Sequence, residues 1–410
     1  MKRILLLLIF LITTAQTIHS QTVVLDANGV TVKWTGTTVP SPYFVQANPR
    51  GTGMEWFAIV NNSSKINITN YANSIQSGIT YFIPSGSSTP IPFNNIVTTL
   101  ITDMSDLFNF PAGSSTFNQP IASWDVSNVT NMSWMFNTTP FNQPIGFWNV
   151  ARVTNMRDMF ASAFNFNQPI GSWNVSNVTN MSYMFEDSTV FNQPIGNWDV
   201  GRVTNMQGMF FSANAFNQPI GSWNVSNVQS MNLMFSRATA FDQNIGSWNV
   251  SNVTYMPDMF YLSGLSTANY DALLIGWSTI SPNETPLKPN VSFSGGNSKY
   301  CNGASARASI INTYGWTITD AGQEANCVLN TDEFETNSIK LYPNPVISVL
   351  NVNIGSNLIN QTYTIIDGLG RVVLNGKLND VESTINVEQL SKGIYYLKVS
   401  GNSATKFIKE

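Results

Sequence analysis

Apolar and polar positions repeat along the middle of this chain with a period of about 25 residues. Trp173, Trp198, Trp223 and Trp248 stand 25 residues apart, and almost the same sequence surrounds each of them. A fixed period of this length predicts stacked, near-identical coils. Such a stack offers an extended repetitive surface rather than a single deep pocket.

The apolar positions within one repeat predict a short strand followed by a short helix. The tryptophan and valine of residues 173–175 are two apart, as on one face of a strand. Residues 178–185 place a valine, two methionines and a phenylalanine on one stripe of a two-turn helix. Ser176 and Asn177 stand where a helix N-cap belongs. Identical Asn and Gln residues in the bends should stack into ladders that satisfy backbone groups.

Thirteen of the chain's 15 methionines occupy the helical stripe of a repeat. Their spacing with valine and phenylalanine favours core packing over soft-metal binding. We therefore predict an α/β solenoid with a strand and a short helix in each coil, and an interior filled by Trp, Met and Phe.

The repeat sequence W-[DN]-V-S-N-V-T-N-M-S-x-M-F…F-N-Q-P-I resembles the bacterial surface-protein 26-residue repeat family, a leucine-rich-repeat relative of the BspA type. The resemblance covers about residues 95–261 and implies a leucine-rich-repeat-like fold, surface location, and adhesion or interaction. Arg152 and Arg202 replace the Asn that follows the predicted strand in the other repeats, so we expect these two coils to cap their helices differently.

The regions before and after the repeats (94–261) carry their own patterns. Residues 21–93 include a turn sequence at Asn28-Gly29 between short apolar runs, which predicts a β-hairpin, and residues 54–60 and 79–83 predict further strands. We expect a β-rich cap here, because the end of a stack needs a cover.

Residues 262–330 keep coil-like pieces without the methionine stripe. Their pattern predicts two divergent terminal coils, followed by a polar, acidic linker at residues 331–338. The predicted helices are residues 270–277 and 306–314, and the predicted strands are residues 291–293 and 316–318.

Residues 339–410 change to short alternating strands, which predict a small Ig-like β-sandwich. The sequences at residues 341–345, 367–371, 393–399 and 406–409 resemble the type IX secretion C-terminal sorting domain. The resemblance implies passage to the periplasm, export by the type IX machinery and removal of the domain; an adhesive Ig-like module is the alternative. The resemblance to the sorting domain assigns the sorting signal to Pro343, Asn344, Pro345, Gly393, Tyr395, Lys406 and Lys409.

The N-terminus has the pattern of a secretory signal peptide at residues 1–20: Lys2-Arg3, an apolar run over residues 4–12, and small and polar residues to Ser20. No later apolar run approaches about 18 residues, so we predict no transmembrane segment in the mature chain. The predicted location is extracellular or at the outer cell surface.

Charge and composition exclude several classes of function. A net charge of −4 with 10% charged residues disfavours a nucleic-acid partner. Removal of the signal peptide takes away His19, the only histidine, and with it every His-based catalytic or metal site. We expect no cofactor and no enzymatic activity. The alternative is a hydrolase that uses carboxylates in the N-terminal region or in residues 262–330.

Cys301 and Cys327 are 26 residues apart, about one coil. Equivalent positions on adjacent coils are close enough for a disulfide, which we predict in an exported protein. Two unpaired thiols are the alternative.

The outward positions beside each tryptophan predict a flat grid of hydroxyls and amides that binds an extracellular protein or a glycan. The alternatives are a solvated face that binds nothing and a passive spacer or coat protein. Phe147 is the only aromatic residue of the grid and its best anchor. Asp125 and Asp199 are three coils apart, roughly 14 Å, too far for a catalytic carboxylate pair. The grid comprises Ser123, Asp125, Phe147, Asn149, Ser172, Asn174, Asn197, Asp199, Ser222, Asn224, Ser247 and Asn249.

Overall fold

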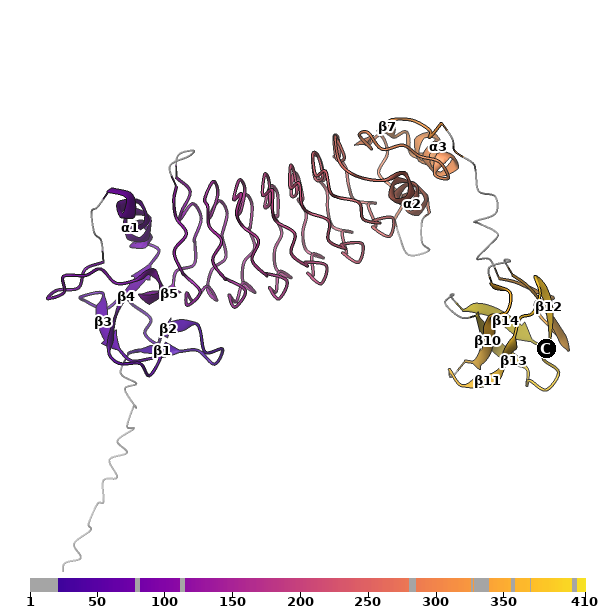
Figure 1. Cartoon of the computed structure of the whole chain (residues 1–410), viewed down its shortest axis with the longest axis horizontal. Helices are drawn as coiled ribbons and strands as arrows, with labels where there is room; N and C mark the ends of the chain where they lie inside the picture. Colours follow the sequence, from indigo (N-terminus) through magenta and orange to yellow (C-terminus); the bar gives the residue numbers. More distant parts are fainter. Residues whose placement is uncertain are drawn as a thin grey trace, which may run out of the picture. The chain divides into compact units, whose positions relative to one another are not determined.

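The computed structural model describes residues 21–77, 82–110, 115–279, 285–325, 327, 339–354, 358–368, 370–399 and 404–410 (Figure 1). The chain divides into two units, Met1–Ala325 and Asn326–Glu410. The predicted signal peptide (residues 1–20), the predicted linker (331–338) and most of the strand predicted at 79–83 lie outside the described residues.

The described residues of the repeats form neither the strand nor the helix that their sequence pattern predicts. Between β5 (Ile96–Leu100) and α2 (Thr267–Ser278), the described residues form turns and single β-bridges. The strands of the structure lie in small, separate sheets before residue 101 and after residue 291. The predicted leucine-rich-repeat-like α/β solenoid, with a strand and a helix in each coil, is therefore wrong.

Left-handed residues explain why the methionine stripe does not form a helix. Tyr183 and Asp187 have φ angles of 56° and 51°, whereas a right-handed helix requires negative φ at every residue. Met184 N donates to Met181 O, and Glu186 N donates to Tyr183 O, which are the bonds of consecutive β-turns. These overlapping turns begin every two residues and bury Met181, Met184 and Phe185, as a helix would, so the apolar spacing fits both structures.

Successive repeats stack through backbone hydrogen bonds. In one coil, the amides of Met181, Tyr183 and Phe185 donate to carbonyls of residues 205, 207 and 209 in the next coil. The amides between them close the turns, so every second amide joins two coils. Single parallel bridges continue this pairing from coil to coil, and Figure 1 shows the coils side by side between β5 and α2.

The interior of the stack is a continuous column of rings and methionines. All 13 repeat methionines have an exposed fraction of 0%. The rings of Phe160, Phe185 and Phe210 stack with centroids 5.7 Å apart from coil to coil. Trp198 is 3% exposed, and its Nε1 donates to Ile170 O of the preceding coil at 3.2 Å. The predicted Trp, Met and Phe interior is confirmed.

Amide side chains of the bends form the predicted ladder. Asn192 Oδ1 accepts from Asn217 N at 3.0 Å and from Gln218 Nε2 at 2.8 Å. The same pair of bonds links Asn167 to Asn192 and Gln193 one coil earlier. Each bend thus satisfies a backbone donor of the next coil, and this prediction is confirmed.

The N-terminal region combines strands with a helix. β1 (Val23–Leu25) and β2 (Val32–Trp34) form the predicted hairpin. β3 (Phe44–Ala47) and β4 (Glu55–Asn61) form a mixed sheet with β5, which follows η1 (Phe93–Asn95). α1 (Lys65–Ser77) was not predicted, although Ile68, Tyr71 and Ala72 are buried at helical spacing. Val32 N donates to Ser123 O at 2.8 Å, so this region covers the first coil.

The other end of the stack contains α2, β6 (Ser292–Ser294), α3 (Ala304–Tyr314) and β7 (Thr317–Thr319), with β6 and β7 parallel. The two helices and two strands predicted here are confirmed to within a few residues. Trp277 of α2 continues the indole ladder, since its Nε1 donates to Ile245 O at 3.3 Å.

The C-terminal unit has two antiparallel sheets around one core that includes Leu350, Ile365, Leu397 and Phe407. The structure adds β12, which the sequence pattern did not predict. One sheet has the order β12 (Glu382–Asn386), β9 (Val349–Asn353), β8 (Lys340–Tyr342). The other has the order β11 (Val372–Lys377), β10 (Thr362–Asp367), β13 (Gly393–Val399), β14 (Thr405–Lys409). Among the described residues, no helix is long and apolar enough to cross a membrane.

Candidate binding groove

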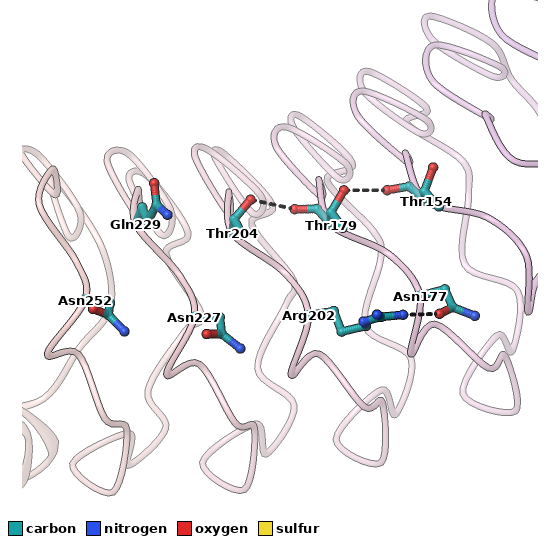
Figure 2. A pocket seen from close by; sticks show the side chains of 8 residues that line it. All are labelled: Thr154, Asn177, Thr179, Arg202, Thr204, Asn227, Gln229 and Asn252. Carbon is teal, nitrogen blue, oxygen red and sulfur yellow. Dashed lines mark hydrogen bonds between the residues drawn. The ribbon is translucent and has the colours of Figure 1, made fainter. Parts of the chain in front are cut away.

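A shallow groove of about 530 Å³ crosses five consecutive coils on the outside of the stack (Figure 2). All eight side chains that line it are polar. One row consists of Thr154, Thr179, Thr204 and Gln229, and the other of Asn177, Arg202, Asn227 and Asn252. The groove therefore presents hydroxyls and amides that recur once per coil.

The threonine row is held in place by the coils themselves. Thr179 Oγ1 donates to Thr154 O at 3.1 Å, and Thr204 Oγ1 donates to Thr179 O at 3.2 Å. Each hydroxyl donates its hydrogen to a carbonyl of the preceding coil. Its oxygen can therefore still accept a hydrogen bond from a ligand. The row is a rigid line of acceptors.

The asparagine row is fixed in the same way and carries one cation within the groove. Asn177 Nδ2 donates to Ala151 O, and Asn227 Nδ2 donates to Gly201 O, both at 2.7 Å. Arg202 takes the place of an Asn and donates from Nη1 to Asn177 Oδ1 at 2.6 Å. A guanidinium has five N–H donors, so exposed Arg202 can still donate to a ligand.

The prediction that Arg152 and Arg202 alter a helix cap is wrong, because the repeats contain no helix to cap. Arg152 instead donates from Nη1 to Asn128 Oδ1 at 3.0 Å, as Arg202 does two coils later. Both arginines therefore belong to the asparagine row, and they place positive charge at every second coil of this part of the stack.

The predicted polar grid lies beside the groove, and the structure changes its first two members. Ser123 and Asp125 are only 6% and 2% exposed, so their predicted outward position is wrong. The N-terminal region buries them: Ser123 Oγ donates to Asn94 O at 2.6 Å. The other ten grid residues, from Phe147 to Asn249, are exposed or partly exposed.

Much of the hydrogen-bonding capacity of the grid is already used within the stack. Asn174 Oδ1 accepts from Ser176 N and Oγ, and Ser172 Oγ donates to Gly146 O. Asp199 Oδ1 likewise accepts from Gly201 N. Phe147 differs, because 60% of its surface is exposed. The groove, whose residues begin three positions further along each coil, is the better ligand site.

Sequence reasoning missed the groove because it assigned Ser176 and Asn177 to a helix cap. The signal was present, since Asn or Arg and Thr or Gln recur at these positions in every repeat from residue 152 to 252. Polar residues that recur at outward positions can either hydrogen-bond to neighbouring coils or bind a ligand. Only the geometry of the coils shows that the two rows of residues form a groove.

The residues of the predicted sorting signal lie together on the C-terminal unit. Asn344 Oδ1 accepts from Ile408 N at 2.9 Å, which holds the Pro343–Pro345 segment against β14. Gly393 of β13 pairs with Lys409 of β14. Elsewhere, Cys301 and Cys327 are both disulfide-bonded. Within the described parts of the chain, no group of three or more His, Cys, Asp or Glu residues is placed to hold a metal ion.

Glu186 lies partly buried on the methionine side of the coils. Burial raises the pKa of its carboxyl to about 7 from an ordinary value of 4.5, and the charges of Asp187 and Asp158 add to this effect. Between these two pH values the folded chain keeps a proton that the unfolded chain has lost. The contribution of Glu186 to the stability of the folded chain therefore falls as the pH rises from 4.5 through 7.

We expect Glu186→Gln to leave the Tm unchanged near pH 4 and to raise it above about pH 8, relative to the unsubstituted chain. Thermal unfolding over this pH range measures the difference. Asp199→Asn, at an exposed position of the grid, is the control and should show no such pH-dependent gain. An equal gain at both pH values for Glu186→Gln would contradict the assignment.

Two families match parts of this chain. Residues 84–195 and 167–273 match the family described as Mycoplasma protein of unknown function, DUF285. Residues 340–410 match the secretion system C-terminal sorting domain. No curated protein matches the chain, and no solved structure matches it either. The repeats are thus similar to the DUF285 family, and the C-terminal unit is a type IX secretion sorting domain, which implies export to the cell surface or the extracellular space.

Proposed function

We propose that this exported protein is an adhesin that binds an extended glycan along the polar groove. The observation that carries the proposal is the unbroken recurrence of acceptor and donor side chains across five coils. Coils about 4.8 Å apart present the same groups at regular steps, which suits a polymer whose hydroxyls also recur along its length. The adhesion that the BspA-type resemblance implies fits this use.

A glycan fits the groove better than an extended polypeptide does. Thr179 N already donates to Thr154 O, and Thr204 N to Thr179 O, both within the stack. A peptide therefore finds no open backbone edge along the threonine row to which it could add as a strand. The eight lining side chains are polar and offer no apolar pocket for peptide side chains.

Replacing Arg202 by Asn tests the groove with little risk to the fold, because Asn227 and Asn252 occupy the same position in later coils. The variant removes a charged donor, so we expect about a tenfold or greater loss of affinity for any glycan held there. A glycan array identifies the ligand, and titration of that glycan measures the loss. Arg237→Ala, outside the groove, is the control and should bind normally.

The proposal fails if no glycan on a broad array binds the mature chain. It also fails if a bound glycan is unaffected by Arg202→Asn combined with Thr179→Val and Thr204→Val. Normal adhesion by a deletion strain would then favour a passive spacer or coat protein.

We propose binding without catalysis. The only histidine, His19, lies in the predicted signal peptide, so a mature chain would lack imidazole for acid–base or nucleophilic chemistry. The purified mature chain should leave its bound glycan intact after prolonged incubation. Appearance of shorter products would show a hydrolase instead.

A further inference from the structure

The outward positions on the methionine side of the coils vary from repeat to repeat, although the backbone there is the same. The residue directly before the second methionine has a φ of 53° to 62° in all six full repeats. Its identity nevertheless changes completely along the stack. The six residues are Trp134, Asp158, Tyr183, Gly208, Leu233 and Asp258. We call this row the variable edge.

Large residues on the variable edge are costly for the fold. A left-handed φ is tolerated best by Gly, Asn and Asp, and a bulky side chain there is strained. Gly208, Asp158 and Asp258 meet this preference, so the coil does not need a large residue. Leu233 violates it and is still partly exposed. Tyr183 violates it too, but its hydroxyl accepts a hydrogen bond from Gln207 Nε2 of the next coil. Strain kept at Leu233, a partly exposed position, points to a use other than folding.

A cavity of about 300 Å³ opens on this side between Phe211, Leu233 and Tyr261. Ser236 also lines the cavity, is 0% exposed, and its hydroxyl has no hydrogen-bond partner in the part of the chain that the structure describes. A buried hydroxyl without a partner is costly. Because Ser236 is fully buried, an incoming ligand would meet mainly the apolar walls of the cavity.

The charges around the cavity are mostly negative. Arg157 and Asp158 neutralise each other through an ion pair of 2.8 Å. Asp187 and Asp258 remain, against Arg237, whose guanidinium lies over the Phe211 ring at 6.0 Å. Asp258 lines the cavity, and Asp187 N donates to Phe211 O beside it. Aromatic residues beside charged groups are typical of energetic hot spots in protein interfaces. A ligand for this surface should carry positive charge.

We propose that the variable edge docks a protein segment with an aromatic or aliphatic side chain flanked by Lys or Arg. The apolar side chain fills the cavity between Phe211, Leu233 and Tyr261. The flanking cations face the carboxylates of Asp187 and Asp258. No residue of this site belongs to the polar groove. The proposal therefore does not depend on glycan binding.

Leu233→Asn separates this role from a structural one. Asn tolerates the left-handed φ of 59° better than Leu does, so the variant should keep or raise the Tm. It also removes one wall of the cavity, so binding should fall by tenfold or more. Leu262→Asn is the matched control: Leu262 is also left-handed, with a φ of 54°, is 49% exposed, and does not line the cavity.

The probe is a displayed library of random peptides, panned on the purified full chain. We expect enriched peptides in which Lys or Arg flanks Phe, Tyr, Trp, Leu or Ile. They should bind Leu262→Asn normally and Leu233→Asn poorly. No enrichment, enrichment of acidic peptides, equal binding to Leu233→Asn, or an equal loss with Leu262→Asn would each overturn the proposal.

Discussion

Replacing Trp198 by alanine should destabilise the stack by about 3–5 kcal/mol, the usual cost of truncating a buried aromatic residue. Trp198 is 3% exposed in the middle of the repeats, so no end region can move in to fill the space. The variant also leaves Ile170 O without the indole donor at 3.2 Å. Phe185 loses its contact with the ring, whose centroid lies 6.4 Å away, so the effect falls at the centre of the stack.

Denaturant unfolding followed by tryptophan fluorescence measures this loss, because most of the chain's 11 tryptophans lie in the stack. Asn197→Ala is the control: the residue precedes Trp198 and is exposed. Its effect should stay within about 0.5 kcal/mol. A loss below about 1 kcal/mol for Trp198→Ala would mean that the indole column does not hold the coils together.

A single methyl group at Gly196 should be almost as damaging. A Cβ at this position would lie 2.3 Å from Pro219 O, a backbone atom of the next coil. Gly171 makes the equivalent approach to Pro194 O at 2.3 Å, and the first repeat alone has an alanine, Ala122, at this position. The later coils therefore depend on a glycine here. The coils must separate or tilt to admit the methyl, and overpacking of this kind costs about 1–3 kcal/mol.

Gly201→Ala is the matched control for Gly196→Ala because it lies in the same coil. Its Cβ would meet Asp199 Oδ1 at 3.1 Å and Asn224 Nδ2 at 3.4 Å, which are side-chain atoms that can move. We expect it to be neutral or slightly stabilising, since alanine restricts the unfolded chain. Equal denaturation midpoints for the two variants would show that the coils are not packed as closely as the structure indicates.

The interior and the export signals could be predicted from the sequence because each depends on local or strictly periodic information. A 25-residue period requires equivalent residues to meet their own copies in the next coil, which places Trp198 against the preceding coil and Asn217 beside Asn192. The sorting domain is recognised from short sequences at residues 340–410. α2 and α3 follow from their own apolar spacing, independently of the stack.

The backbone path within each coil was decided only by the tertiary structure. A valine, two methionines and a phenylalanine at residues 178–185 satisfy a helix and a chain of β-turns equally well. In the turns, alternate amides such as Tyr183 N donate hydrogen bonds to the next coil. In a helix the same amides would donate to carbonyls of their own helix. Hydrogen bonds between coils, which no single repeat contains, therefore select the turns over the helix.

The position of each surface group was also beyond the sequence pattern. Ser123 and Asp125 repeat the outward positions of later coils, but the N-terminal region buries them. Conversely, the polar groove and the cavity beside Leu233 form between residues of successive coils, so only the stacked coils define their shape. The sequence alone determined which side chains face inward and how often they recur. Contacts between coils decided the backbone geometry and the binding surfaces, because these depend on atoms brought together only by folding.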